Sequence, residues 1–149
     1  MRSLAAASLG LAAATFVVGC GSGNEFETAP AAGRVTLDGK PVAEGSVVTT
    51  PAQGWPARGE LDADGRFTLS TYKPGDGAIL GPHEIVVIAQ SGPDPSEHFE
   101  RPPPAPTKWL IPERYGSRAT SGLSFTVEKG RQNEINLELF TDPRRAAGN

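Results

Sequence analysis

The sequence predicts an all-β fold, a single sandwich of seven short strands arranged in two sheets. Apolar and polar residues alternate over several short stretches, which is the period of a half-buried strand. The chain holds 18 glycines and 14 prolines, and this high content indicates many turns and few helices. Outside the N-terminal apolar segment, no stretch has the spacing of three and four residues that an amphipathic helix requires.

Seven segments carry the strand pattern: residues 34–37, 46–50, 58–61, 66–71, 85–89, 123–127 and 134–139. Asp38-Gly39, Asp62–Gly65 and Lys129-Gly130 provide turns between strands. The segment 85–89 is apolar on both faces, so we expect it to be the most buried, central strand.

The inward positions of these strands define a candidate core. At about 1.5–3 kcal/mol for each buried apolar side chain, such a core offsets most of the conformational entropy lost on folding. The predicted core residues are Val35, Leu37, Val47, Leu61, Phe67, Leu69, Ile85, Val87, Leu123, Phe125, Val127, Ile135, Leu137 and Leu139.

Residues 90–122 do not follow this pattern. The segment has 33 residues, seven of them proline, and almost no periodicity. Within it, Pro102–Pro106 predicts a stiff polyproline II rod. A structureless loop of this length is uncommon inside a compact domain, and it is usually functional or disordered.

The N-terminal segment has the order of an export signal: a basic residue, Arg2, then an uncharged apolar run over residues 4–18, then small residues. We predict a signal-peptide helix within residues 1–19, because the run is short for a spanning helix, which needs about 20 apolar residues. Val17-Val18-Gly19-Cys20 resembles the lipobox of bacterial lipoproteins. The resemblance implies that Cys20 carries a diacylglyceryl thioether and becomes the acylated N-terminus. The alternative is an ordinary secretory peptide that contains a cysteine.

Cleavage before Cys20 leaves 130 of the 149 residues, enough for one domain and a tether. We expect a flexible tether at residues 20–30, the sandwich at 31–141 and a disordered tail at 142–149. The chain has 14 basic and 17 acidic residues, so it lacks the basic surface of a nucleic-acid-binding protein. Lipidation also explains why an exported chain has one unpaired cysteine.

Two motifs, Gly33–Val42 and Asp62–Leu69, resemble carboxypeptidase regulatory-like domains, which have a transthyretin-like (prealbumin-like) sandwich. Residues 72–77, 111–116 and 119–123 are similar to bacterial lipoproteins that carry this domain. The resemblance covers residues 31–140 and implies a structural or binding module. One departure is His83, which stands where the family usually has an aromatic residue and puts a tyrosine-corner hydrogen bond there in doubt.

The residues predict no catalytic, metal or cofactor site. The neighbours of His83 and His98 along the chain suggest no catalytic triad. Hydroxyisourate hydrolases share the sandwich, but they depend on a C-terminal Tyr-Arg-Gly-Ser that this chain lacks. Asp62–Gly65 resembles a calcium loop, yet Thr71 stands where that loop needs an acid, so a hairpin turn fits better. Two histidines without a cysteine partner make no zinc site.

Three aromatic residues, Trp55, Trp109 and Tyr115, are candidate ligand-binding residues because they fall in predicted loops. Aromatic side chains on the loops of a sandwich bind sugars or peptides in many modules. The competing interpretation, which we favour, is that Trp109 packs the long loop onto the sandwich edge.

The sequence therefore predicts an exported, non-enzymatic lipoprotein that an N-terminal acyl anchor holds on the extracytoplasmic side of a bacterial membrane. Its expected role is structural or adhesive, in binding another envelope protein or a polysaccharide, with no nucleic acid and no cofactor. A carbohydrate-binding module that uses the loop aromatics is the alternative. A hydrolase of the hydroxyisourate type is a distant third.

Overall fold

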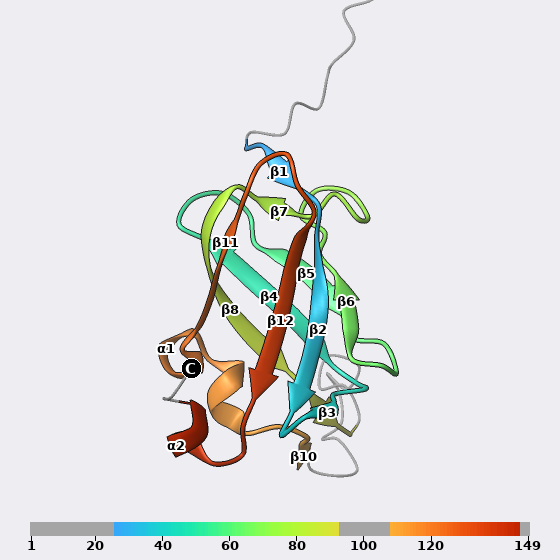
Figure 1. The fold of residues 1–149 in the computed structure, drawn as a ribbon, viewed down its shortest axis with the longest axis vertical. Helices are drawn as coiled ribbons and strands as arrows, with labels where there is room; N and C mark the ends of the chain where they lie inside the picture. Colours follow the sequence, from blue (N-terminus) through green and yellow to red (C-terminus); the bar gives the residue numbers. More distant parts are fainter. Residues whose placement is uncertain (1–25, 93–107, 147–149) are drawn as a thin grey trace, which may run out of the picture.

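The computed structural model describes residues 26–92 and 108–146, and Figure 1 draws the other segments as a thin grey trace. The predicted signal helix, Cys20, His98 and the predicted polyproline rod therefore lie outside the described residues. Within the described ranges the chain is predominantly β, as predicted, and its helices are short.

The described residues form twelve strands, two four-residue α-helices and one 3-10 helix. The prediction of seven strands is too low, because five two-residue strands are too short to show a period and were missed. The strands are β1 (Thr28–Ala29), β2 (Ala31–Leu37), β3 (Lys40–Pro41), β4 (Ser46–Pro51), β5 (Ala57–Glu60), β6 (Arg66–Thr68), β7 (Ala78–Ile79), β8 (Gly81–Ile88), β9 (Gln90–Ser91), β10 (Lys108–Trp109), β11 (Leu123–Val127) and β12 (Asn133–Leu139). The helices are η2 (Glu113–Gly116), α1 (Arg118–Ser121) and α2 (Pro143–Ala146).

Two four-stranded sheets form the body of the molecule (Figure 1). One is antiparallel, with the order β11-β8-β4-β5. In the other, β2 lies between β12 on one side and β3 and β6 on the other. Strands β2 and β12 are parallel, with Asn133 opposite Ala31 and Leu139 opposite Leu37. They are the only parallel pair among the described strands.

The apolar faces of the two sheets meet in one core, which gives a sandwich-like body. Strand β8 lies between β11 and β4 and buries Ile85, Val86 and Val87, so the prediction of a central strand is confirmed, whereas Ile88 at its end is exposed. Most of the predicted core is buried, and Leu37, Leu61, Leu123 and Phe125 are half-buried against it. The buried members are Val35, Val47, Phe67, Leu69, Ile85, Val87, Val127, Ile135, Leu137 and Leu139.

The expectation of a structureless segment over residues 90–122 is wrong for its second half. Strand β10 pairs with β9, with Trp109 opposite Gln90, and η2 and α1 follow it. Ile111 and Tyr115 are buried in the core and hold this segment against the sandwich. Periodicity cannot reveal such a segment, because its elements have only two to four residues.

The predicted tether is too long. Strand β1 pairs with β7, with Thr28 opposite Ile79, and Ala29 is buried in the core. The backbone N–H of Leu80 also donates to the carbonyl of Glu27 at 3.1 Å. The chain is therefore held to the body from residue 27 onward, and only residues 21–25 separate Cys20 from the described part of the chain.

The prediction of a disordered tail is also wrong for residues 142–146, because Pro143–Ala146 forms α2. The chain just before α2 contacts the turn formed by Asp38 and Gly39. Both turn residues have positive φ, 48° and 81°, as a two-residue hairpin turn requires. The Thr141 hydroxyl donates to Asp38 Oδ2 at 2.6 Å. This hydrogen bond is the main reason why the pKa of Asp38 lies below its ordinary value.

Candidate functional site

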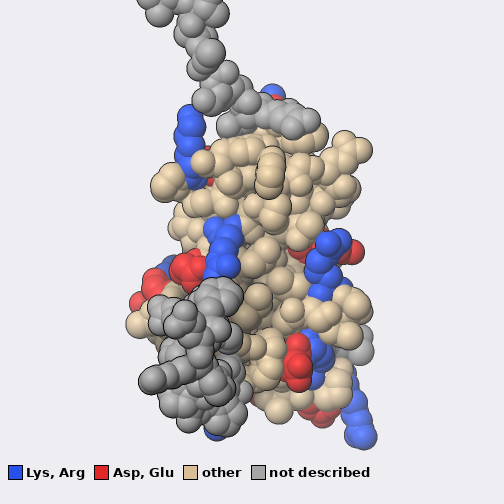
Figure 2. All heavy atoms as spheres, turned by 180° about the vertical axis from the view of Figure 1, so that it is seen from behind, with Lys and Arg blue, Asp and Glu red and all other residues tan. Residues whose placement is uncertain are grey.

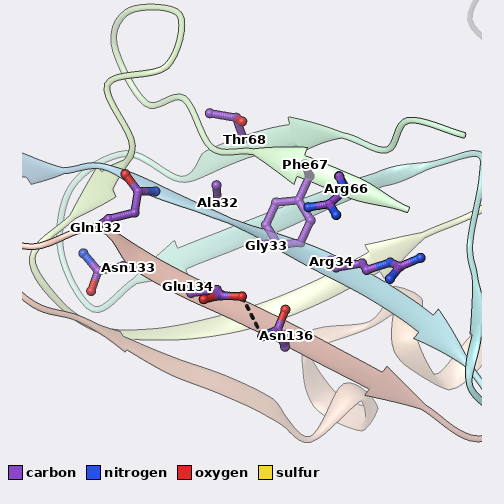
Figure 3. A pocket seen from close by; sticks show the side chains of 10 residues that line it. All are labelled: Ala32, Gly33, Arg34, Arg66, Phe67, Thr68, Gln132, Asn133, Glu134 and Asn136. Atoms are coloured by element: carbon purple, nitrogen blue, oxygen red, sulfur yellow. Dashed lines mark hydrogen bonds between the residues drawn. The ribbon is translucent and has the colours of Figure 1, made fainter. Parts of the chain in front are cut away.

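A hollow with several polar lining residues lies on the outer face of β2, β6 and β12 and has a volume of about 510 Å³ (Figure 3). Strand alternation creates this face, because the neighbouring residues Val35 and Ile135 are directed into the core and are buried. The residues that line the hollow are Ala32, Gly33, Arg34, Arg66, Phe67, Thr68, Gln132, Asn133, Glu134 and Asn136.

Two arginines stand side by side in this hollow. The antiparallel register places Arg34 opposite Arg66, and like charges in that position repel each other. Arg34 Nε donates to the backbone carbonyl of Asp64 at 2.8 Å. Within the described ranges, neither guanidinium lies in an ion pair, because the five ion pairs there involve other basic residues.

The third strand adds a carboxylate and an amide to the same face. Asn136 is opposite Arg34 across the β2–β12 pair, and its Nδ2 donates to Glu134 Oε1 at 3.1 Å (Figure 3). Both side chains are exposed. A planar guanidinium binds a carboxylate or phosphate through two parallel hydrogen bonds. The face is therefore suited to hold an acidic group between the arginines while Asn136 binds a neighbouring polar group.

Close approach of the backbone limits what can occupy the centre of this sheet. A Cβ atom at Gly33 would lie 1.9 Å from the backbone oxygen of Ile135 and 3.0 Å from Cζ of Phe67. No side chain larger than hydrogen fits there without a shift of β2 relative to β12. The absence of a side chain at Gly33 is thus part of how these strands pair.

The structure does not bring the three predicted ligand-binding aromatics together. Trp55 is 65% exposed, and the adjacent Gly54 contacts Phe26 and Ile79 near β7. Trp109 is half-buried in β10, and β7 and β10 lie at opposite ends of the molecule (Figure 1). Tyr115 is buried.

Trp109 follows the packing interpretation. Its indole covers Gly116, where a Cβ atom would lie 2.4 Å from Trp109 Cη2. The ring therefore fastens β10 to η2, which is the role that we favoured over ligand binding.

Tyr115 is a structural tyrosine whose hydroxyl ties η2 to the end of β12. It accepts a hydrogen bond from the backbone N–H of Phe140 at 3.0 Å and another from Arg114 at 3.0 Å. The Arg114 guanidinium also lies over the Tyr115 ring, 4.5 Å from its centroid, and donates to the carbonyl of Phe140. Buried polar groups are therefore satisfied here by one phenol and one arginine.

His83 is buried, and its Nε2 donates to the carbonyl of Ile79 at 2.7 Å. Burial lowers the pKa of His83 below its usual 6.5 and outweighs the backbone hydrogen bonding to Ile79 and Thr49, which favours the charged ring. The adjacent Glu84 is engaged by Arg118 at 2.8 Å. No carboxylate or hydroxyl within the described ranges forms a hydrogen bond with the His83 ring, so it has no partner there for nucleophilic catalysis.

Asp62–Gly65 forms a tight turn, as we preferred to a calcium loop, but the strands that flank it do not form a hairpin ladder, because β5 pairs with β4 and β6 pairs with β2. Asp62 Oδ1 accepts hydrogen bonds from the backbone N–H groups of Asp64 and Arg66 at 2.9 and 2.8 Å, and Gly65 has φ 73°. The Asp62 carboxylate thus stabilises the turn. Among the described side chains, no three of the His, Cys, Asp and Glu type converge to hold a metal ion.

Reasoning from the sequence missed the polar hollow entirely. Alternation alone places Arg34, Arg66, Glu134 and Asn136 on outward positions of three strands. It does not say that β6 and β12 flank β2, because residues distant in the sequence make these pairs. The sequence pattern does not give the order of the strands in the sheet, and that order is needed to bring these four side chains together.

The sequence matches no known protein-family model and no curated protein sequence. In structure, the chain is similar to a 9R-lipoxygenase from Cyanothece PCC8801, with a TM-score of 0.36 and 15% sequence identity. That likeness covers 78% of this chain and 18% of the lipoxygenase chain. It is too low to bear on function. None of the helices within residues 26–92 and 108–146 has the length and apolar character needed to span a membrane.

We predict that Tyr115→Phe lowers the free energy of unfolding by about 1–3 kcal/mol, because the buried N–H of Phe140 loses its acceptor. Urea denaturation measures this effect. Tyr72→Phe is the matched control, because the Tyr72 hydroxyl is buried and has no hydrogen-bond partner in the described part of the chain. Its removal is expected to leave stability nearly unchanged. Equal losses for the two variants would contradict the role assigned to Tyr115.

A second prediction concerns pH. The unfolded chain binds more protons than the native one between the lowered pKa of native His83 and the unfolded value of about 6.5. The free energy of unfolding therefore falls as the pH drops below about 6.5. His83→Gln removes this dependence above about pH 5, where the carboxylates stay ionised. His98→Gln controls for the second histidine, and identical pH profiles for wild type and His83→Gln would refute the assignment.

Proposed function

We propose that this protein is an exported, lipid-anchored, non-enzymatic β-module that binds another component of the bacterial envelope. The observation that carries the proposal is the side-by-side pair Arg34 and Arg66 over a polar hollow, with no ion-pair partner among the described residues. The two adjacent positive charges repel each other, and Glu134 on the same face bonds to Asn136 and forms no ion pair with either arginine among the described residues, so an acidic group of a partner would relieve the repulsion.

The anchor in this proposal is Cys20. Val17–Cys20 has the lipobox order, and the apolar run before it ends at the only cysteine in the chain. Acylation at Cys20 would place the β-rich body beside an extracytoplasmic membrane surface. The membrane itself is then the first partner, and the hollow serves a second one.

The finer fold assignment, a transthyretin-like or carboxypeptidase regulatory-like sandwich, is part of the proposal. Its support is the Asp62–Gly65 turn, which leads into a short strand containing the buried Phe67, and the Asp38-Gly39 turn that ends β2. Both lie in the two motifs that carry the resemblance. Domains of this kind act as structural or binding modules, which agrees with a partner-binding role.

Three observations favour a non-enzymatic role over a hydrolase. His83 is buried against a backbone carbonyl, Asp62 stabilises a turn and Tyr115 bonds to Phe140. The groups most able to act as base, ligand or acid are therefore used in the packing of the fold. The carbohydrate-binding alternative loses its support, because the structure does not bring Trp55 together with Trp109 and Tyr115, which pack within the fold.

Site-specific photo-crosslinking in the native membrane tests this function. A photoreactive amino acid at Thr68, inside the hollow, is expected to yield an adduct with an envelope component. Thr126, on the exposed face of β11, is the control position and is expected to yield none. Adducts of equal yield from both positions would count against the hollow.

The double variant Arg34→Ala/Arg66→Ala is expected to reduce the Thr68 adduct about tenfold, the equivalent of one lost charge-assisted hydrogen bond of about 1.4 kcal/mol. Arg58→Ala is the matched control, because Arg58 is an exposed arginine paired with Glu60 on the other sheet. An adduct that persists without Arg34 and Arg66 would rule out recognition of an acidic group by these side chains.

A further inference from the structure

The end of the molecule where the described chain begins is built from four segments. Strands β1 and β7 pair there, and Gly54 in the loop between β4 and β5 contacts Phe26 and Ile79. The turn between β11 and β12 reaches the same end, where Lys129 Nζ lies 2.8 Å from Glu27 Oε2. Figure 1 shows β1 and β7 at this end, from which the N-terminal trace leaves the body.

The length of chain before this end limits how far it can lie from Cys20. Residues 21–25 form the whole link between Cys20 and Phe26. At about 3.3–3.6 Å for each extended residue, the link spans about 20 Å at most. If Cys20 is acylated in the bilayer surface, β1, β7 and the loop after β4 lie close to that surface, while β10 lies at the far end.

The loop Ala52–Pro56 presents one large aromatic side chain at this end. Its residues are Ala52, Gln53, Gly54, Trp55 and Pro56, all exposed and none charged. Trp55 has 65% of its surface exposed, the largest value among the exposed large apolar residues in the described ranges. Gly54 has φ 93°, and a Cβ atom there would lie 2.6 Å from Ile79 Cδ1 and 2.8 Å from Phe26 Cδ2, so the loop packs closely on these residues next to Trp55.

The charges at this end are nearly balanced, so they do not oppose contact with lipid. Lys129 pairs with Glu27, and Arg131 pairs with Glu128 at 2.9 Å. Asp76 accepts hydrogen bonds from three backbone N–H groups, and Lys73 is exposed. Figure 2 shows that, on the rear face, uncharged residues make up most of the surface at the upper end, with basic side chains at its margin.

We infer that Ala52–Pro56 is a membrane-contacting loop in which the Trp55 indole sits in the lipid headgroup layer beside the acyl anchor. Tryptophan is favoured in that layer because its ring is largely apolar while its N–H still meets water. The inference rests on the proposed acylation of Cys20. The protein would then be attached to the membrane at two points, the acyl group on Cys20 and the Trp55 loop. In this orientation the polar hollow on β2, β6 and β12 faces sideways along the membrane.

The test uses the full-length, acylated protein reconstituted in phosphatidylethanolamine and phosphatidylglycerol vesicles with brominated acyl chains. The chain has two tryptophans, so Trp109→Phe reports Trp55 alone and Trp55→Phe reports Trp109 alone. We expect the Trp55 emission to fall by at least half relative to unbrominated vesicles, and the Trp109 emission to stay within a tenth. Equal quenching of both residues in protein that floats with the vesicles would overturn the inference.

A second readout leaves both tryptophans in place. Because Cys20 is blocked by its acyl group, Gln53→Cys and Leu110→Cys each provide one thiol for a nitroxide label, and both residues are exposed. The Gln53 label is expected to be accessible to oxygen dissolved in the lipid, and the Leu110 label to a water-soluble relaxation agent. Equal accessibility profiles at the two positions would again overturn the inference.

Flotation separates this failure from a failure of the anchor. If the wild-type protein and Cys20→Ser both remain with the soluble fraction, the proposed anchor is wrong and the membrane-contacting loop falls with it. If the wild-type protein floats and Cys20→Ser does not, the anchor stands and the quenching decides the role of Trp55 alone.

Discussion

The pairing of β2 with β12 is the contact on which the rest of the structure depends. These strands come from the two ends of the domain, and their parallel register brings Ala31 opposite Asn133 and Leu37 opposite Leu139. The pair supplies the buried side chains Val35, Ile135, Leu137 and Leu139 to the core. Without β12, the second sheet would lose most of its apolar face, and β8 and β4 would have little to pack against.

Hydrogen bonds at both ends of β12 hold it in this register. At its start, the buried Asn133 side chain donates to the carbonyls of Pro30 and Glu128 and accepts from the N–H of Glu128. At its end, Tyr115 bonds to Phe140, and Asp38 bonds to Thr141. Polar side chains at both ends of β12 therefore fix this one strand, because a parallel edge strand has no hairpin to β2 that would set its register.

The sequence predicts the elements that depend on local pattern and misses those that depend on a partner. Strands such as Leu123–Val127 and Asn133–Leu139 follow from alternation, and the turns at Asp38 and Asp62 follow from their residue types. Strand β1 exists because β7 lies beside it, and the segment after residue 108 is ordered because Ile111 and Tyr115 enter the core. Contacts of this kind, between segments distant in the chain, leave no periodic pattern of apolar residues in the sequence.

The candidate sites divide in the same way. The candidate site at Cys20 can be predicted from a local sequence motif. The hollow with Arg34 and Arg66 can be predicted only if the order of three strands that are distant in the chain is known. The three aromatics form one candidate site in the sequence because all fall in predicted loops, yet Trp109 lies in β10 and Tyr115 in η2, and β10 is at the opposite end of the molecule from β7. Two surface features lie apart from each other, the arginine pair on the side of the body and Trp55 at its end. Their separation allows one surface to contact a membrane while the other contacts a partner.

Amide hydrogen exchange tests the central role of the β2–β12 pair most directly. The account predicts that the amides of Ile135 and Leu137, which lie in β12 and pair with β2, exchange only through global unfolding. Their free energies of exchange should then equal those of Ile85 and Val87 in β8. A lower value for Ile135 and Leu137, with β8 still protected, would show that the sheets are separate units and would contradict the account.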